Sequence, residues 1–265
     1  MDRIVQNYEY YMSRVDRRVQ NWFGMGEPWV TAGFLIAYVL SIIGIKKFMA
    51  NRKPFELRIF MILYNFFQVI VSFYIFVEIA VVAIQSKYSM TCEPVDYSND
   101  PLALRMASVL HLYYIMKKVD LLDTVIFALR KKANQISFLH VFHHSSMVIN
   151  SYSGVMWVPG GQTFFLCCLN SLVHAIMYGY YGLSACGPSI QKYLWWKKYL
   201  TQVQLTQFMI IMTHAVVNIF QKDCAYPKGY SIAFVLYGIF ITSLFMNFYK
   251  KSYTKTEGKI EKLKQ

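Results

Sequence analysis

Long apolar runs separated by short polar segments recur along the whole chain. Each run has 17 to 26 residues, and as a helix rising about 1.5 Å per residue it can cross about 30 Å of hydrocarbon. We therefore predict an all-α integral membrane protein with seven transmembrane helices, and six or eight as alternatives because three runs contain polar residues. The runs occupy residues 29–45, 59–84, 106–129, 136–158, 163–185, 199–220 and 230–249.

The composition agrees with a membrane protein. Of the 265 residues, 56% are hydrophobic, which leaves too little polar surface for one or two soluble domains. The chain shows no internal repeat, low-complexity segment or soluble appendage, so we predict one integral membrane domain over residues 29–249. A segment at 1–28 precedes this domain, and a basic cytosolic tail at 250–265 follows it.

The N-terminal segment carries a shorter pattern of its own. Apolar residues recur there at helical spacing between positions 4 and 23, and arginines lie at other positions. This pattern predicts an amphipathic helix at the membrane interface. Because no apolar stretch precedes a small-residue cleavage site, we predict no removed signal peptide. The apolar positions are Ile4, Tyr8, Met12, Val15, Val19 and Phe23.

Basic residues alternate between the two sides of the predicted bundle. A net charge of +13 would suggest a nucleic acid partner for a soluble protein, but in a membrane protein the placement of the charges matters more, and we predict no such partner. One side holds 17 Lys and Arg, and the opposite segments 1–28, 85–105 and 221–229 hold 8. The positive-inside rule therefore places the richer side and the C-terminus in the cytosol, with the N-terminus luminal or external. The richer segments are 46–58, 130–132, 192–198 and 250–264.

The five cysteines fit neither a disulfide scaffold nor a zinc site. Cys167, Cys168 and Cys186 lie in or at the end of the fifth run, where burial as small apolar residues is the usual role. Cys92 and Cys224 instead lie in the polar loops after the second and sixth runs, on the non-cytosolic side. If that side is oxidising, a bridge between Cys92 and Cys224 is predicted, and two unpaired thiols are the alternative.

Polar side chains from four predicted helices reach one level of the bilayer. Such groups are costly inside a membrane, so each is a candidate functional group. His140 and His143 lie about 9 and 14 Å from the cytosolic end of their helix, and His174 lies about 15 Å from that of the next helix. His111 and His214 lie about 24 to 29 Å away, and we expect structural or interfacial roles for them. The other groups at this level are Asp123, Thr124, Gln204 and Gln207.

Local spacing groups these polar residues further. His140, His143 and His144 stand at i, i+3 and i+4, which places them on one face of a helix. Lys117 and Asp120 are three residues apart, a spacing at which opposite charges can pair inside a membrane. Helical steps of three or four also connect Asp120 with Asp123 and Thr124, Asn170 with His174 and Tyr178, and Thr201 with Gln204 and Gln207.

Acyl transfer is the chemistry that we prefer for this layer. A neutral imidazole can act as a general base or as a nucleophile that forms an acyl-imidazole, while a second histidine accepts protons. Asn170, Gln204 and Gln207 could donate hydrogen bonds to a thioester oxyanion, and the basic cytosolic rim could hold a polyphosphate carrier. Cys167 is a rival nucleophile, but it lies about 10 Å along the helix from His174.

Two other classes of protein compete with this interpretation. The HxxHH helix suggests a metal-dependent fatty acyl desaturase or hydroxylase, but a two-iron site of that type uses about eight nitrogen ligands and this chain has six histidines. Four of them could still hold one metal, so this class is the second choice; acyl transfer itself requires no metal. A seven-helix receptor or transporter would account for the number of spans but not for HxxHH.

Five motifs, in order between residues 51 and 250, resemble the ELO family of very-long-chain fatty acid elongases. The resemblance implies a multi-pass enzyme of the endoplasmic reticulum membrane, with six of its seven helices around a narrow tunnel. Such an enzyme condenses acyl-CoA with malonyl-CoA, giving 3-oxoacyl-CoA, CO2 and CoA, and binds these thioesters as substrates without a resident cofactor. As further partners we consider the other enzymes of fatty acid elongation and a second copy of the chain. The motifs are NRKPFELR at 51–58, KxxDxxDT at 117–124, HVFHH at 140–144, NSLVHAIMY at 170–178 and TxxQLxQF at 201–208.

The resemblance also implies a role for each candidate site residue. His143 would take the acyl group as an imidazole adduct and His174 would assist at the same centre, while His140 and His144 would orient the group or relay protons. Asp120 stands where the family usually carries Glu. The residues that would line or support the site are Asn170, Gln204, Gln207, Asp120, Asp123 and Lys117.

The same resemblance also suggests which residues bind the CoA carrier and which cysteines form a disulfide in the luminal loops. Our candidates for binding the CoA phosphates are Arg130, Tyr180, Lys197 and Lys198. Family members also carry a luminal disulfide at positions that resemble Cys92 and Cys224.

Overall fold

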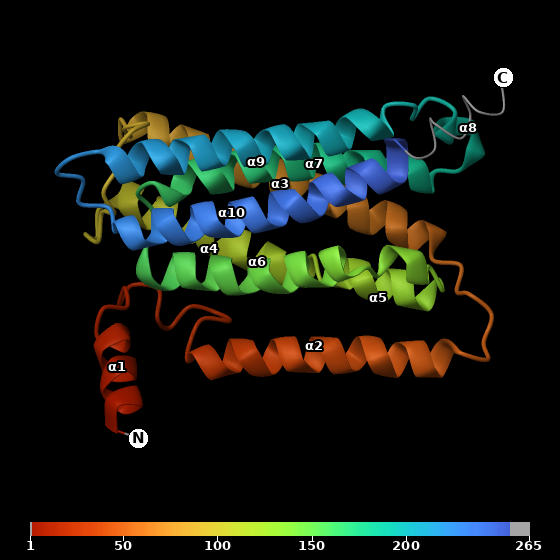
Figure 1. Cartoon of the computed structure of the whole chain (residues 1–265), viewed down its shortest axis with the longest axis horizontal. Helices are drawn as coiled ribbons and strands as arrows, with labels where there is room; N and C mark the ends of the chain where they lie inside the picture. The colour runs from red at the N-terminus through yellow and green to blue at the C-terminus, as the bar shows by residue number, and fades with distance from the viewer. Residues whose placement is uncertain (1, 255–265) are drawn as a thin grey trace. The chain divides into compact units, whose positions relative to one another are not determined.

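The computed structural model describes residues 2–254, and helices account for all seven apolar runs of the sequence (Figure 1). Six of the runs correspond to one helix each, with ends within four residues of those predicted. The predicted tail at 250–265 lies outside the described residues except for its first turn, η2. The elements are α1 (Asp2–Met12), α2 (Pro28–Met49), α3 (Arg58–Gln85), α4 (Pro101–Val119), α5 (Leu122–Leu129), η1 (Ala133–Gln135), α6 (Phe138–Trp157), α7 (Thr163–Ala185), α8 (Pro188–Gln191), α9 (Lys197–Phe220), α10 (Lys228–Tyr249) and η2 (Lys250–Thr254).

Five helices, α2, α3, α7, α9 and α10, are long and apolar enough to cross a membrane. Helix α4 carries Arg105, Lys117 and Lys118, and α6 carries three histidines, so these two helices are less apolar. All the regular structure of the described residues is helical, as predicted. The number of seven transmembrane helices stays a prediction.

The run at 106–129, predicted as one helix, is divided in the structure into α4 and α5. The backbone N–H groups of Leu121, Asp123 and Thr124 bond to carbonyls three residues earlier, each with an N–O distance of 3.2 Å. This i to i+3 bonding is the tighter winding of a 3₁₀ turn, in which residues three apart nearly eclipse one another. Lys117 and Asp120, which have that spacing, form an ion pair at this turn.

The amphipathic helix predicted over 4–23 is wrong beyond Met12, where α1 ends. The chain then forms turns, and Val19 is fully buried instead of lying on an exposed helix. The N–H of Asp16 donates to the carbonyl of Met156 at the end of α6, with an N–O distance of 2.9 Å. This tertiary contact satisfies the N–H of Asp16, which a continued helix would otherwise bond within itself. The helix therefore does not extend along the rest of the apolar pattern.

The described residues form two compact units, each built from segments that are far apart in the sequence. The first unit comprises α1, α2, α4, α5 and α6 together with residues 78–88. The second unit comprises residues 57–77, which include most of α3, the loop at 89–93, and the chain from residue 165 onward, which includes nearly all of α7 and the whole of α8, α9 and α10. The single integral domain over 29–249 stays a prediction.

In the first unit, α4 packs against α6, and α2 packs against both α5 and α6. The core of this unit is made by large apolar side chains of α4 and α6 that are almost fully removed from the surface. In a membrane these side chains stabilise the unit through close van der Waals packing between helices, because lipid tails are as apolar as the side chains. They include Met106, Leu110, Tyr114, Val148 and Met156.

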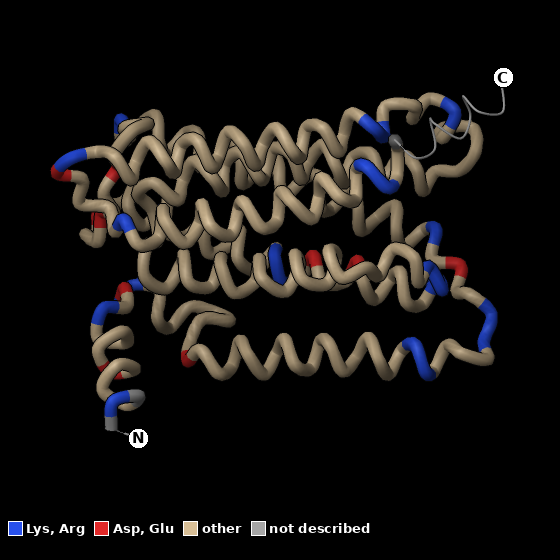
Figure 2. Tube along the Cα trace, viewed as in Figure 1, with Lys and Arg blue, Asp and Glu red and all other residues tan. Residues whose placement is uncertain are grey.

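Polar connections gather at opposite ends of the first unit (Figure 2). At one end, Nζ of Lys131 donates to the carbonyl of Ala50 at 2.9 Å, which joins the basic connections that follow α2 and α5. At the other end, Nη2 of Arg18 donates to the carbonyl of Asp96 at 2.9 Å, which joins the N-terminal segment to the loop before α4. Within this unit, the two sets of connections are therefore separated as the charge pattern predicts.

In the second unit, α9 packs against α10, and Gly238 permits a close approach of the two helices. A Cβ atom at Gly238 would lie 2.7 Å from Cγ of Met212, which is closer than carbon atoms pack. The start of α9 and the end of α10 are joined by Gln202, whose Nε2 donates to the hydroxyl of Tyr249 at 2.8 Å. The opposite end of this helix pair is closed by a disulfide.

Candidate functional site

Helix α6 brings its three histidines together on one face. Ser137 caps the helix by accepting a hydrogen bond from the N–H of His140 at 3.2 Å, which is the usual role of serine at this position. The ring centroids of His140 and His144 lie 4.3 Å apart, and those of His143 and His144 lie 5.8 Å apart. The three imidazoles therefore form one contiguous cluster, as the i, i+3, i+4 spacing predicts.

A chain of hydroxyl groups connects this cluster to α2. Oγ1 of Thr124 lies 2.9 Å from Nε2 of His140 and 2.7 Å from the hydroxyl of Tyr38. Thr124 is fully buried, and Tyr38 is 6% exposed. We did not predict a role for Tyr38 from the sequence, because it stands in a predominantly apolar run, far in sequence from the other polar groups of the predicted layer. The only sequence signal is that the hydroxyl of a buried tyrosine needs a hydrogen-bond partner.

A buried ion pair lies beside the histidine cluster. Nζ of Lys117 is 3.0 Å from Oδ2 of Asp120, and only 5% and 4% of these side chains are exposed. Both charges act electrostatically on the imidazole of His143. The ammonium of Lys117 also lies 4.7 Å from the ring centroid of Tyr113, in cation–π contact. The predicted pair is confirmed, and pairing is what allows two charges to stay buried at this depth.

The second unit carries the other half of the predicted polar layer. Asn170 and Gln207 are buried, with 6% and 4% of each residue exposed. Nε2 of Gln204 donates to Sδ of Met177 at 3.3 Å, which joins α9 to α7. The ring of His174 lies 5.8 Å from that of Tyr178, one helical turn along α7. Helices α7 and α9 thus bring two buried amides, the half-buried amide of Gln204 and the half-buried imidazole of His174 to this unit.

The two groups of candidate residues belong to different units. His140, His143 and His144 lie in the first unit with Lys117, whereas His174 lies in the second. The convergence of His143 and His174 on one substrate carbon therefore stays a prediction. The first unit also holds Asp120, Asp123 and Arg130, and the second holds Asn170, Tyr180, Lys197, Lys198, Gln204 and Gln207.

The two histidines outside the layer make structural contacts, as predicted. Nε2 of His111 lies 2.8 Å from the carbonyl of Phe23, and this bond anchors the N-terminal segment to α4. The ring of His214 stacks on Phe165 with the ring centroids 4.2 Å apart. A hydrogen bond to a backbone carbonyl accounts for the presence of His111, and aromatic packing accounts for that of His214.

The candidates for phosphate binding differ in exposure. Arg130 follows directly on α5, at the basic end of the first unit. Lys197 opens α9 and is exposed, whereas Lys198 is half-buried. Tyr180 is buried, and its ring packs edge-on against Trp196 with the ring centroids 4.9 Å apart. Their role in binding CoA stays a prediction.

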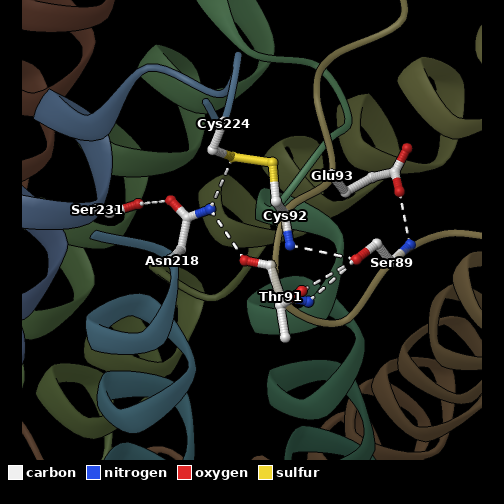
Figure 3. The surroundings of a disulfide bond; sticks show 7 residues. All are labelled: Ser89, Thr91, Cys92, Glu93, Asn218, Cys224 and Ser231. Carbon is white, nitrogen blue, oxygen red and sulfur yellow. Dashed lines mark hydrogen bonds between the residues drawn. A yellow bond between two sulfur atoms is a disulfide. The ribbon is translucent and has the colours of Figure 1, made fainter. Parts of the chain in front are cut away.

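A disulfide joins Cys92 to Cys224 in the second unit, as predicted (Figure 3). The Cα atoms are 5.7 Å apart, a usual separation for such a bridge. Nδ2 of Asn218 donates at 3.3 Å both to the carbonyl of Thr91 and to Sγ of Cys224. The hydroxyl of Ser231 donates to Oδ1 of Asn218 at 2.8 Å, so one buried amide ties the bridge to α9 and α10.

The remaining cysteines are free thiols, and Cys167 is buried, in agreement with a packing role. Within residues 2–254, no group of three or more His, Cys, Asp and Glu side chains is arranged to hold a metal ion.

Comparison with known proteins supplies an independent observation. The model of the family described as ELO, the GNS1/SUR4 family, matches residues 23–261. The chain is 45% identical to very long chain fatty acid elongase 4 of Homo sapiens over 249 residues, which cover 94% of this chain and 79% of that protein. It is 46% identical to very long chain fatty acid elongase 1 of Homo sapiens over 257 residues, covering 96% and 92%. It is also 40% identical to very long chain fatty acid elongase 7 of Drosophila melanogaster over 265 residues, covering 98% and 80%.

Proposed function

Because the chain belongs to the ELO family, we propose that it elongates very long chain fatty acids as a membrane-embedded 3-oxoacyl-CoA synthase. The reaction joins a long-chain acyl-CoA to malonyl-CoA and releases CO2 and CoA. Family membership decides among the classes that the sequence left open, in favour of acyl transfer. The metal-dependent desaturase or hydroxylase, suggested by the HxxHH helix, and the receptor or transporter, suggested by the number of spans, are therefore wrong.

In the first step, a neutral imidazole attacks the acyl thioester. The lone pair of one ring nitrogen of His143 adds to the thioester carbon, and the C–S bond breaks with release of CoA as its thiolate. The product is an acyl-imidazole, and the proton lost from the ring passes to His140 or His144 and then to the thiolate. The contact between the three rings supports this assignment, because it gives the proton an acceptor next to the nucleophile.

In the second step, malonyl-CoA supplies the carbon nucleophile. Loss of CO2 leaves the electron pair of the broken C–C bond on the acetyl carbon as an enolate, so no metal or external base is needed. The enolate attacks the acyl carbon, the C–N bond to His143 breaks, and the departing imidazolate takes up a proton from solvent through the neighbouring histidines, which regenerates the neutral imidazole. We assign stabilisation of the oxyanions to Asn170, Gln204 and Gln207, whose amides are polar groups buried or half-buried in the second unit, and assistance to His174.

The buried ion pair has a supporting role in this scheme. Lys117 and Asp120 place a positive and a negative charge beside His143 at fixed positions, where little water screens them. They can therefore stabilise charge that develops on the imidazole and on the thioester oxygen. We assign a similar supporting role to Asp123, which stands in the first turn of α5.

The arrangement of the site in the membrane follows from the distribution of charge. We propose seven transmembrane helices, six of them around a narrow tunnel that takes the acyl chain, with the thioester held at the polar layer. The CoA phosphates then lie at the basic cytosolic end, where Arg130, Tyr180, Lys197 and Lys198 bind them. The protein resides in the endoplasmic reticulum membrane with its N-terminus luminal. The separation of basic from less basic connections within the first unit supports this orientation.

The observation that carries this mechanism is the contact of the His144 imidazole with those of both His140 and His143, beside a buried ion pair. Purified full-length protein is incubated first with a ladder of acyl-CoAs alone and then with labelled malonyl-CoA. We expect CoA to be released in the first incubation, up to one equivalent per protein, and labelled 3-oxoacyl-CoA in the second. His143→Ala should lower the rate of both steps by at least about 100-fold.

A matched control distinguishes chemistry from damage to the fold. His111→Gln removes a histidine outside the layer and retains a donor for the carbonyl of Phe23, so it should keep the activity of the unmodified protein. Normal condensation by His143→Ala would contradict the role of this histidine. Release of CoA only after malonyl-CoA is added would contradict the acyl-imidazole. The other enzymes of elongation and a second copy of the chain stay predicted partners.

A further inference from the structure

Helix α2 joins the first unit through a single stripe of buried residues. These residues recur every four or seven positions, as expected for one face of a helix, and most of the other side chains of α2 are exposed. Two members of the stripe are polar, and the structure gives each of them a hydrogen bond to another helix. The buried residues of α2 are Thr31, Tyr38, Ile42 and Met49.

The two polar members of the stripe have different partners. Oγ1 of Thr31 lies 3.3 Å from the hydroxyl of Tyr114 on α4, a residue of the apolar core. The hydroxyl of Tyr38 lies 2.7 Å from Oγ1 of Thr124, which in turn contacts His140. A phenylalanine at position 38 would fill nearly the same volume. The hydroxyl of Tyr38 is therefore needed only for its hydrogen bond.

Thr124 is suited to transmit this bond to the histidine cluster. It lies at the 3₁₀ turn between α4 and α5, is fully buried, and has one proton to donate and two lone pairs to accept with. If Tyr38 donates to Thr124, then Thr124 can donate to Nε2 of His140. If His140 donates from Nε2, then Thr124 can donate to Tyr38.

In both directions of this chain of hydrogen bonds, the same ring nitrogen of His140 is engaged. Nε2 is engaged with Thr124, so Nδ1 is the ring nitrogen left to exchange a proton with the rest of the site. The ring is further held between Phe127, with ring centroids 5.2 Å apart, and His144, with ring centroids 4.3 Å apart. The orientation of His140, and with it the ring nitrogen that faces the rest of the site, is thus set from outside the α4–α6 pair.

We propose that Tyr38 is a positioning residue of the condensing site, which acts through Thr124 to hold His140 in one orientation, with Nε2 engaged and Nδ1 left for proton exchange. Helix α2 then does more than anchor the unit in the membrane, because it sets the proton path that serves the neighbouring nucleophile. This inference rests on the proposed role of the histidine cluster in acyl transfer. It concerns the rate of proton movement and not the binding of substrate.

The test compares hydroxyl-deleted variants in the first half-reaction. Tyr38→Phe and Thr124→Val each remove one link while keeping the shape of the side chain, and Thr124→Ser restores the hydroxyl. We expect the rate of CoA release at saturating acyl-CoA to fall about five- to tenfold in Tyr38→Phe and Thr124→Val, as for the loss of one hydrogen bond. The KM for acyl-CoA should stay within about twofold, and Thr124→Ser should keep most of the rate.

Two further variants separate positioning from stability. Thr31→Val removes the other polar contact of the same α2 stripe, so it should lower thermal stability as much as Tyr38→Phe but leave the rate of CoA release unchanged. The double variant Tyr38→Phe/Thr124→Val should be no slower than Thr124→Val alone, because both changes interrupt one chain.

Three results would overturn the proposal. These are a normal rate in Tyr38→Phe, an equal loss of rate in Thr31→Val, and multiplying losses in the double variant. Failure of the acyl-imidazole mechanism is distinguishable, because the unmodified protein would then release no CoA before malonyl-CoA is present. In that case the same variants are compared in the complete condensation. Positioning by Tyr38 then requires that Tyr38→Phe and Thr124→Val be slower than the unmodified protein, Thr124→Ser and Thr31→Val.

Discussion

Lys117 and Asp120 form an ion pair inside the first unit, with Nζ 3.0 Å from Oδ2 and at most 5% of either side chain exposed. Two opposite charges can remain in such a place only because each compensates the other. Removal of one partner leaves an uncompensated buried charge, which typically costs about 3 to 5 kcal/mol.

This pair can be tested by a double-mutant cycle. We expect Lys117→Met and Asp120→Asn each to lower the free energy of unfolding by about 3 kcal/mol or more, and the double variant to lose less than the sum. Asp120→Glu should retain the pair and most of the stability. Thermal or denaturant unfolding in one detergent measures all four.

A second ion pair on α4 serves as the control. Arg105 and Glu78 lie 2.8 Å apart, but 43% of the Arg105 side chain is exposed. Arg105→Gln should therefore cost no more than about 1 kcal/mol. Equal losses at Arg105 and Lys117 would contradict the view that burial gives the inner pair its importance.

The disulfide should contribute to stability because it closes a long loop. Cys92 and Cys224 are 132 residues apart in sequence, so the bridge restricts the unfolded chain strongly. We expect a reducing agent to lower the free energy of unfolding by about 2 to 5 kcal/mol. Calorimetry with and without reductant provides the measurement. The variant Cys92→Ser/Cys224→Ser should be destabilised at the outset and should not respond to reductant.

Asn218, which bonds to the disulfide region, should contribute to stability through its hydrogen bonds. Its amide is fully buried and bonds to Thr91, Cys224 and Ser231. Asn218→Ala would leave buried polar partners without a bond, at a cost of about 1 to 3 kcal/mol. Asn247→Ala, on an exposed face of α10, should change the free energy of unfolding by less than about 0.5 kcal/mol.

The crossing of α9 and α10 should depend on Gly238. A valine at this position would meet the side chain of Met212 and should destabilise the protein by about 1 to 3 kcal/mol through overpacking. Shortening the opposing side chain in Gly238→Val/Met212→Ala should recover part of the loss. Gly229→Ala, at a position with no atom within 4 Å of an added Cβ, should be tolerated. Similar losses at Gly229 and Gly238 would refute close packing as the cause.

Much of the fold follows from features that are local in the sequence. Helix α7 spans the predicted residues 163–185 because a long apolar run has a continuous helix as its favourable state in a membrane. The contacts among His140, His143 and His144 follow in the same way, since residues at i, i+3 and i+4 share a face in any helix. The pairing of Cys92 with Cys224 could be anticipated because both stand in polar loops on one predicted side.

One departure from prediction involves a contact between distant segments, and the other coincides with a buried ion pair that is local in sequence. Helix α1 ends at Met12 although its apolar period continues, because the turns after it bond to the end of α6. The 3₁₀ turn at Asp120 interrupts an otherwise helical run, at the place where the buried ion pair forms. A local pattern reports which conformation a segment favours by itself, and tertiary bonds of a few kcal/mol are sufficient to change that preference.

By itself, the sequence determined a helical membrane protein, the side on which the basic connections gather within the first unit, the histidine cluster of α6 and the family of condensing enzymes. Only the tertiary structure decided that the hydroxyl of Tyr38 reaches His140 through Thr124. Tyr38 and Thr124 are 86 residues apart in the chain, and no periodicity links them. Their contact depends on how α2 lies against α5, which is set by the packing of whole helix faces rather than by any one motif.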